Sequence, residues 1–257
     1  MFAPVFDHAL HLEGEALARD VDAGTAASLL EGRRKCRPPV NGTVYGVLLN
    51  DRAALDALGD AVNAPPYKAP PKAPVLYVKP RNTFAGHRAE VRIPDSVEAV
   101  AVGASLGVVM GRTATRVSEA DALDYVAGWT VVADLYVPHP NVYRPSVRYR
   151  ARDGFCVMGP VVVASRHVPD PDRLEIEIAI DGKETFVAST SSTIRNVATL
   201  LAEVTDFMTL SAGDVLTLGV PHGVPCARVG DRVIVRIADW APLHFSVARE
   251  ARAGGQA

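Results

Sequence analysis

The feature that most constrains the fold is a series of short apolar segments rich in valine and isoleucine, each bounded by glycine, proline or a Gly-Asp pair. Segments of this length and composition predict β-strands rather than helices. Strands are expected at residues 43–49, 75–79, 97–102, 106–110, 129–137, 156–163, 174–180, 183–187, 215–218 and 232–237. So many strands beside few helices predict a mixed, mainly β domain.

One pair of these strands is predicted to form a hairpin. Residues 174–180 alternate strictly between apolar and polar side chains, and Asp181-Gly182 then leads into residues 183–187. Alternation of this kind indicates a strand with one buried and one solvent-facing side. Glu175 and Glu177 are therefore interpreted as surface residues and not as a pair of metal ligands.

Helical spacing of apolar residues predicts a few helices around these strands. They are expected at residues 51–62, at 118–127, where Ser118 is placed to cap the first turn, and at 193–208. An alanine-rich stretch at 16–33 also has helical spacing, and prolines end it. We divide the chain into an N-terminal arm at 1–42 for docking or oligomerisation, a domain at 43–248 and a tail at 249–257.

Composition excludes several classes of function. The chain has 257 residues with 27 Lys and Arg against 29 Asp and Glu, a formal net charge of −2, so nucleic acid and anionic membranes are not expected as partners. No apolar run approaches the roughly 20 residues that span a bilayer. The N-terminus has no signal-peptide pattern, and Cys36, Cys156 and Cys226 are too far apart for a zinc site. A cytoplasmic protein with reduced thiols is predicted.

Two segments suggest a catalytic site. Gly128-Trp-Thr-Val-Val-Ala-Asp134 ends an apolar strand with a carboxylate, and Gly213-Asp214-Val-Leu-Thr-Leu-Gly-Val-Pro-His-Gly223 forms a strand and a glycine-bounded loop. Without further information, a carboxylate at a strand end such as Asp134 is more often a turn or capping residue than a site residue. Together the segments resemble the fumarylacetoacetate hydrolase family over residues 41–247. The resemblance implies that family's β-rich C-terminal-domain fold and cleavage or tautomerisation of 2-oxo acids at Mg²⁺ or Mn²⁺.

The resemblance also implies where metal ligands should lie. The family takes them from a Glu-x-Glu pair on one strand and an Asp on a later strand, and Asp134 matches the Asp. Gly103 and Ser105 stand at the glutamate positions. Because hard divalent cations need several oxygen ligands, we expect weak metal binding through Asp134 or none.

Other site residues follow from the same resemblance. Arg150 replaces a lysine near the active site, so Asp134 and Arg150 are the candidate catalytic residues. Lys79 and the loop Gly219-Val220-Pro221 are the candidate substrate-binding residues. The family's arginine four residues after the Asp is Pro138 here, and the helix at 51–58 lacks the family's histidine.

Within the family, four segments are similar to the N-terminal half of the bifunctional isomerase/decarboxylases of 4-hydroxyphenylacetate (homoprotocatechuate) degradation. They are Tyr67-Lys-Ala-Pro-Pro-Lys72, Tyr77-Val-Lys-Pro-Arg-Asn-Thr83, Tyr143-Arg-Pro145 and Arg152-Asp-Gly-Phe-Cys156. The similarity implies a subunit of a 2-hydroxyhepta-2,4-diene-1,7-dioate isomerase and 5-oxopent-3-ene-1,2,5-tricarboxylate decarboxylase. Its substrate would be a 2-oxo di- or tricarboxylic acid, and its partner a second copy, a metal-bearing paralogous subunit, or both.

Two alternatives remain open at this stage. The chain could be a metal-independent isomerase or hydrolase of 2-oxo acids that uses Asp134 and Arg150, or a non-catalytic scaffold that keeps only the fold.

Overall fold

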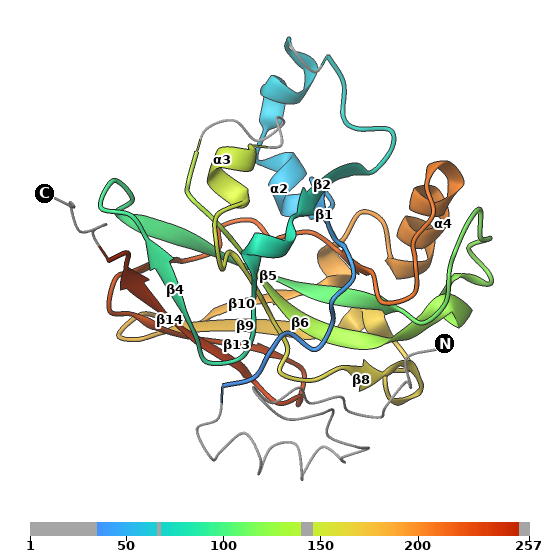
Figure 1. Ribbon diagram of the computed structural model, residues 1–257. Helices are drawn as coiled ribbons and strands as arrows, with labels where there is room; N and C mark the ends of the chain where they lie inside the picture. The colour runs from blue at the N-terminus through green and yellow to red at the C-terminus, as the bar shows by residue number, and fades with distance from the viewer. Residues whose placement is uncertain (1–34, 66–67, 140–145, 252–257) are drawn as a thin grey trace, which may run out of the picture.

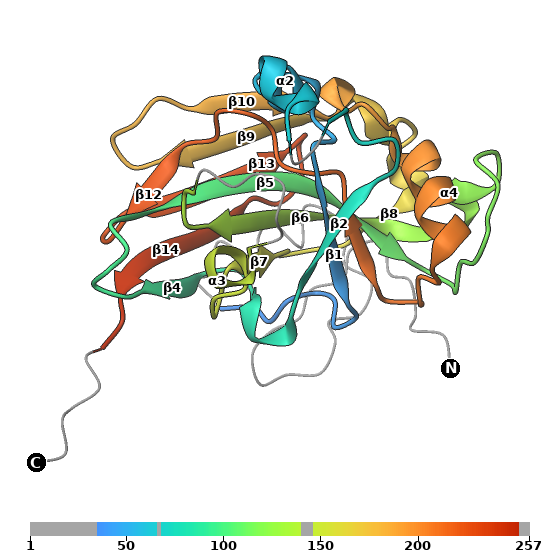
Figure 2. The same cartoon turned by 90° about the horizontal axis from the view of Figure 1, so that it is seen from above.

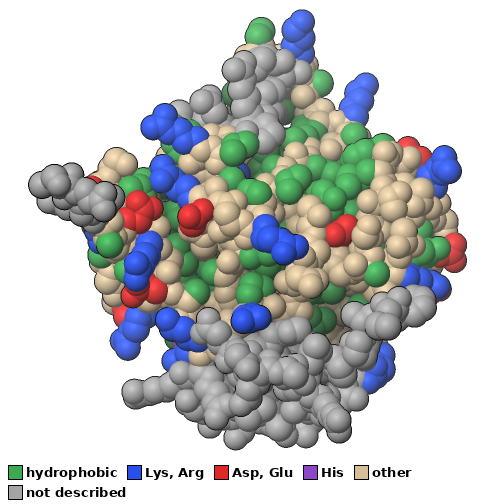
Figure 3. Space-filling model, in the orientation of Figure 1, with side chains coloured by type: hydrophobic (Ala, Val, Ile, Leu, Met, Phe, Trp, Pro, Cys, Tyr) green, Lys and Arg blue, Asp and Glu red, His purple; other side chains and the backbone are tan. Residues whose placement is uncertain are grey.

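The structure is a computed structural model that describes residues 35–65, 68–139 and 146–251. Two β-sheets pack against each other, and short helices lie at their edges (Figure 1). The helix predicted at 16–33 lies outside the described residues. No helix in the described ranges is long and apolar enough to cross a membrane. On the face seen in Figure 3, the Lys and Arg side chains are interspersed with Asp and Glu.

The larger sheet has nine strands and carries the candidate site. Its main path runs β2-β1-β11-β5-β6-β7-β3, with β12 paired to β5 and β8 paired to β6. The strands are β1 (Val44–Leu48), β2 (Val75–Lys79), β3 (Phe84–Ala85), β5 (Ala99–Met110), β6 (Val126–Tyr136), β7 (Cys156–Met158), β8 (Val163–Ala164), β11 (Val215–Thr217) and β12 (Cys226–Arg228).

The smaller sheet has five strands in the order β10-β9-β13-β14-β4. They are β4 (Ala89–Ile93), β9 (Glu175–Ile180), β10 (Phe186–Ser189), β13 (Arg232–Ile237) and β14 (Leu243–Arg249). The hairpin predicted at 174–187 is β9 and β10, which pair antiparallel. Ile176 and Ile178 are buried, whereas Glu175 is exposed and Glu177 half-buried, so the predicted solvent face is confirmed.

The helices are short and lie outside the sheets. The α-helices are α2 (Arg52–Asp56), α3 (Val147–Arg150) and α4 (Val197–Phe207). The 3₁₀ turns are η1 (Gly59–Asn63), η2 (Arg81–Thr83), η3 (Ala122–Tyr125), η4 (Ser165–His167), η5 (Pro171–Arg173) and η6 (Thr190–Ser192). The Asn196 side chain caps α4 by accepting a hydrogen bond from the Thr199 N–H, so the helix begins later than the predicted residue 193.

The long strands β5 and β6 are buried on both faces. Along β5, every second side chain from Val100 to Met110 joins the main hydrophobic core, which also takes in Ile178, Val235 and Phe245 from the smaller sheet. The other face of β5 and β6 carries Gly103, Ser105 and Asp134. Because the first face packs against the smaller sheet, the residues predicted for the site lie on the opposite face.

The larger sheet curls so that its first strands close over this opposite face. Strand β2 is four strands away from β6 in the sheet order, which would place them about 19 Å apart if the sheet were flat. The Tyr77 hydroxyl of β2 nevertheless contacts Asp134 of β6. In Figure 2, accordingly, β1 and β2 cross over β5 and β6.

Several element predictions were wrong at their bounds, and each error has a local cause. The strands predicted at 97–102 and 106–110 are the single strand β5, because Gly103 and Gly107 lie within a sheet rather than in a turn. The helix predicted at 118–127 is only the turn η3, because Ser118 bonds to Asp121 and β6 already begins at Val126.

Two more predicted elements are divided, and four strands were missed. The strand at 156–163 is interrupted by Gly159–Pro160 and forms β7 and β8, and the helix at 51–62 breaks into α2 and η1 at Gly59. Four strands were not predicted. Strands β3 and β12 have only two and three residues, whereas β4 and β14, which pair in parallel, do alternate between apolar and polar residues as strands do. Arg249, placed in the predicted tail, is the last residue of β14.

A pair of histidines, one buried and one half-buried, joins the segment before β4 to β14. The backbone N–H of His244 donates to Nδ1 of His87 over 3.3 Å, and the two rings lie 5.3 Å apart in an edge-to-face contact. His87 is almost fully buried. Burial, with smaller contributions from His244 and Arg88, lowers the pKa of His87 to about 3. His87 is therefore neutral in the folded protein across most of the pH range.

This pair predicts a loss of stability in mild acid. An unfolded histidine takes up a proton near pH 6.5, whereas His87 in the folded state does so only near pH 3, so below about pH 6.5 the unfolded state binds more protons. From about pH 7 to pH 5 we expect His87 to reduce the free energy of unfolding by about 2 kcal/mol, measured by urea denaturation. His87→Gln should remove this part of the pH dependence, and His167→Gln, at an exposed position, should retain it.

Candidate active site

Asp134 is the centre of the candidate site. It lies near the end of β6, directly opposite Gly103 of β5, and only 1% of it is exposed. A carboxylate buried this deeply requires hydrogen bonds or opposite charges around it. The structure provides three such groups, two from β2 and one from α3.

Strand β2 directs Tyr77 and Lys79 at the two oxygens of Asp134. The Tyr77 hydroxyl donates to Oδ2, and the Lys79 ammonium lies 2.5 Å from Oδ1. Because residues i and i+2 of a strand point the same way, both side chains enter the site while Val78 between them is half exposed. The Tyr77 ring occupies the space above Gly46 of β1, where an added Cβ would lie 2.1 Å from the ring.

Lys79 is held by the backbone as well as by Asp134. Its Nζ donates to the carbonyl oxygens of Leu135, Arg150 and Phe155, each at 2.9 Å. Only 1% of Lys79 is exposed, and every donor of its ammonium is used inside the protein. The substrate contact of Lys79 remains a prediction. The geometry argues against it, because no N–H of the ammonium is left for a substrate.

Arg150, at the end of α3, covers the carboxylate on the outer side. Its guanidinium lies over the rings of Tyr77 and Tyr136, at 4.9 and 4.4 Å from their centroids. Its Nη1 is 3.5 Å from the Tyr77 hydroxyl and 3.8 Å from Oδ2 of Asp134. Arg150 is the most exposed of the groups that contact the carboxylate, with 11% of its side chain accessible.

The charges of this cluster leave an excess of one positive charge. Burial and the neighbouring Asp134 raise the pKa of Tyr77 well above 10, so its phenol is a neutral donor. Burial alone would lower the pKa of Arg150, but Tyr77 and Asp134 outweigh it and the pKa is raised. Lys79 and Arg150 thus face the single carboxylate of Asp134. A net positive site favours an anionic ligand.

The two positions of the family's glutamates cannot act as ligands here. An added Cβ on Gly103 would lie 2.6 Å from the Asp134 carbonyl oxygen and 2.7 Å from a methyl group of Val220. The Ser105 hydroxyl accepts from the Leu218 N–H at 3.1 Å and donates to the Leu106 carbonyl at 3.3 Å. Val220 fills the space beside Gly103, and Ser105 is engaged with the backbone.

The loop that carries Val220 is fixed by residues that follow β1. The Asn50 side chain donates to the Leu218 carbonyl at 2.9 Å. The Asp51 carboxylate accepts from the His222 N–H at 3.0 Å and from the Ser192 hydroxyl at 2.6 Å. These bonds hold residues 218–222 at both ends.

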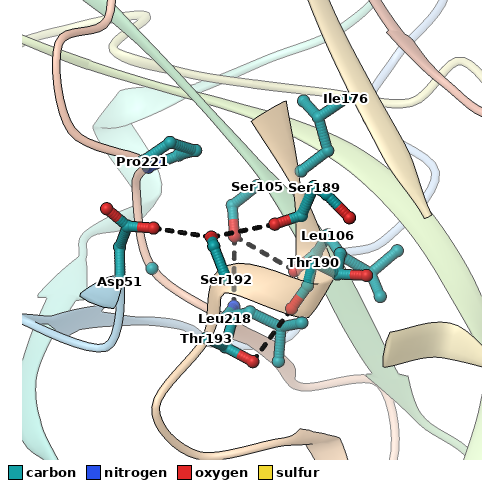
Figure 4. A pocket seen from close by; sticks show the side chains of 11 residues that line it. Asp51, Ser105, Leu106, Ile176, Ser189, Thr190, Ser192, Thr193, Leu218 and Pro221 are labelled. Carbon is teal, nitrogen blue, oxygen red and sulfur yellow. Dashed lines mark hydrogen bonds between the residues drawn. The ribbon is translucent and has the colours of Figure 1, made fainter. Parts of the chain in front are cut away.

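A small polar pocket remains beside this loop. Its volume is about 10 Å³, room for about one water molecule. Asp51, Ser105, Ser192, Thr193, Gly219 and Pro221 are among the residues that line it (Figure 4). In this conformation the pocket is too small for a dicarboxylic acid.

A divalent cation does not fit these residues. Both oxygens of Asp134 are engaged by Tyr77 and Lys79, and a positive ammonium already lies where a cation would approach. Within the described ranges, no group of three His, Cys, Asp or Glu side chains is placed to hold a metal ion.

The structure brings most of the predicted site residues together. Asp134, Arg150 and Lys79 form one cluster, and Val220 reaches Gly103 at its edge. Cys156, opposite Asp134 on β7, is fully buried, and burial raises its thiol pKa to about 12.

Sequence reasoning missed three residues that shape the site: Tyr77, Asn50 and Asp51. A signal for Tyr77 existed, because it lies two residues before Lys79 on a predicted strand and so shares its face. No comparable signal pointed to Asn50 or Asp51, whose partners lie more than 140 residues away in the sequence.

The chain matches one protein family over nearly all of its described length. Residues 43–248 match the Fumarylacetoacetate (FAA) hydrolase C-terminal family. The 4-hydroxyphenylacetate degradation bifunctional isomerase/decarboxylase of Escherichia coli is 38% identical over 211 residues, which are 82% of this chain and 48% of that protein. The chain spans about half the length of the curated relatives it matches.

Solved structures agree with this match. The 2-hydroxyhepta-2,4-diene-1,7-dioate isomerase from Mycobacterium marinum is 26% identical, with a TM-score of 0.70 over 86% of this chain and 80% of that one. A fumarylpyruvate hydrolase from Pseudomonas aeruginosa, solved with Mn²⁺ and pyruvate, has a TM-score of 0.71 over 97% and 99% of the chains. At 20% identity this second likeness shows only that the two chains share a fold. The Mn²⁺ is bound by that hydrolase.

We predict that the purified chain binds Mg²⁺ or Mn²⁺ in the millimolar range or not at all, because Asp134 is a single carboxylate whose oxygens already contact a phenol and an ammonium. Gly103→Glu combined with Ser105→Glu should not create a site, because Val220 and the Asp134 carbonyl obstruct residue 103. Titration calorimetry measures the metal affinity of the unmodified chain and of the double variant. Micromolar affinity in the unmodified chain would show that the cluster opens to admit a metal.

Proposed function

Because the chain belongs to the fumarylacetoacetate hydrolase family, we propose that it is the metal-free half of a two-part isomerase/decarboxylase acting on small 2-oxo di- or tricarboxylic acids. The reactions are isomerisation of 2-hydroxyhepta-2,4-diene-1,7-dioate and decarboxylation of 5-oxopent-3-ene-1,2,5-tricarboxylate. The divalent-metal chemistry belongs to a paralogous subunit with intact ligands. This chain contributes the shared fold and a positively charged site, as a homodimer, in complex with that paralogue, or both.

One observation carries the proposal: Asp134 is fully engaged by Tyr77 and Lys79 in a chain that matches half of a bifunctional enzyme. A phenol donates to one oxygen of this carboxylate and an ammonium lies against the other, so the approach of a metal ion or a proton is opposed. The relatives of this chain are enzymes, so a half without its own metal site is most simply explained as part of a larger enzyme.

Arg150 is the residue of this cluster best placed to meet an anion. It combines partial exposure with a fixed position between two aromatic rings, and a guanidinium can pair with a carboxylate in two-point geometry. We assign Arg150 to recognition of a substrate carboxylate. We assign a substrate-binding role also to the loop Gly219-Val220-Pro221, which reaches Gly103.

A metal-independent isomerase is the second candidate, and the same exposure of Arg150 favours it. In that case Arg150 would stabilise an enolate, and Asp134 would hold Arg150 in place over 3.8 Å. A non-catalytic scaffold is the third candidate and assigns no role to Arg150.

We predict that the isolated chain turns over either substrate at least about 10³-fold more slowly than the pair formed with a metal-bearing paralogue, because it lacks several kcal/mol of transition-state stabilisation. Stopped-flow absorbance for the isomerisation and carbon dioxide release for the decarboxylation give the two rates. The rate of the paralogue alone is the reference for each of the two reactions.

Variants of this chain separate the three candidates. For the two-part enzyme, Arg150→Gln should raise KM of the pair, whereas Arg148→Gln, exposed on the same helix, should have no effect. Fast turnover by the isolated chain that is lost in Arg150→Gln identifies the metal-independent isomerase. A chain that changes neither the rate nor the stability of the paralogue disproves the two-part enzyme.

A further inference from the structure

Four oxygens surround the ammonium of Lys79. They are Oδ1 of Asp134 at 2.5 Å and the carbonyl oxygens of Leu135, Arg150 and Phe155 at 2.9 Å. The three carbonyls use the three N–H donors of the ammonium, and Oδ1 lies against it as a charge contact without a hydrogen bond. The arrangement therefore resembles a coordination shell for a cation more than a set of separate hydrogen bonds. We call these four oxygens the oxygen cage.

Three of the cage oxygens do not depend on any side chain. Leu135 lies within β6, Arg150 ends α3, and Phe155 immediately precedes β7. The Phe155 backbone also accepts from the Leu135 N–H at 3.0 Å, which ties two of these segments together. The cage is consequently built into the backbone and should persist when the Lys79 side chain is shortened.

The charge and the distances of the cage fit a monovalent cation. One carboxylate balances one positive charge, and Arg150 nearby already adds a second. Rings of backbone carbonyls coordinate monovalent ions in place of water, whereas Mg²⁺ requires oxygens at about 2.1 Å in octahedral geometry. Carbonyls at 2.9 Å are too far away for Mg²⁺ and suit an ammonium.

We propose that the oxygen cage is a monovalent-cation site whose permanent occupant is the tethered ammonium of Lys79, and that shortening this side chain turns it into a binding site for a free alkylammonium ion. Lys79 is accordingly a positioning residue. It ties β2 to the cage, whose segments are already joined by backbone hydrogen bonds, and through Asp134 it sets the charge of the site. This inference does not depend on the reaction proposed above.

The test is chemical rescue of stability. Lys79→Ala removes the atoms of one n-propylammonium ion, so the probe is n-propylammonium chloride, compared with choline chloride at equal ionic strength. The thermal unfolding midpoint (Tm) of Lys79→Ala should rise by about 2–4 °C when the n-propylammonium concentration reaches a few times its Kd. The unmodified chain should show no difference between the two salts. Mg²⁺ and Mn²⁺ should not replace the amine.

Lys183→Ala is the matched control. Lys183 also donates to a backbone carbonyl, that of Cys226, and to a carboxylate, that of Asp231, both at 2.7 Å, but its side chain is 37% exposed. Water can take the place of its ammonium, so no amine-specific rise is expected. An equal rise in Lys183→Ala would show a general salt effect and overturn the proposal.

A second pair of variants covers the case in which Lys79→Ala does not fold. Lys79→Met leaves the Asp134 charge without its cation, and adding Asp134→Asn removes that charge. If Asp134 supplies the negative charge of the cation site, the double variant should be more stable to urea than Lys79→Met alone. A double variant no more stable than the single one, or a stronger rescue by Mn²⁺ than by n-propylammonium, contradicts the proposal.

Discussion

The buried ion pair between Lys79 and Asp134 is the interaction on which the rest of the site depends. Two opposite charges that are each 1% exposed can remain in a protein only if their hydrogen-bonding capacity is satisfied, and the three carbonyls around Lys79 complete this requirement. Removing one partner of such a pair typically costs about 3–5 kcal/mol. The pair therefore fixes how far β2 curls over β6, and with it the positions of Tyr77 and Arg150.

Small residues make this closure possible. Gly46 leaves room for the Tyr77 ring, and Gly103 leaves room for Val220, because a Cβ at either position would lie within 2.7 Å of these side chains. Tyr77 and Val220 therefore fill the space beside these two glycines, and a glutamate placed at residue 103 alone would create a steric conflict.

Much of the fold could be predicted from local patterns. The bounds of β2 and β13 agree with the predicted 75–79 and 232–237, because strands with a regular apolar pattern between glycine or proline residues are recognisable without their neighbours. The helix expected at 118–127 failed, because its sequence signals cannot show that β6 takes up residues from Val126 to pair with β5. Strand β14 escaped notice, because its partners β13 and β4 define it more than its own composition does.

By itself, the sequence determined the mainly β class, the resemblance to the family, and the absence of glutamates at residues 103 and 105, since each of these is a property of local residue types. It also indicated that Asp134, Arg150 and Lys79 belong to the site. Only the tertiary structure decided that Lys79 and Tyr77 engage the Asp134 carboxylate and that Asn50 and Asp51 fasten the loop at 218–222. The physical reason is that these contacts join residues 55 (from 79 to 134) to 171 positions apart in the sequence, and their geometry is set by the curl of the sheet.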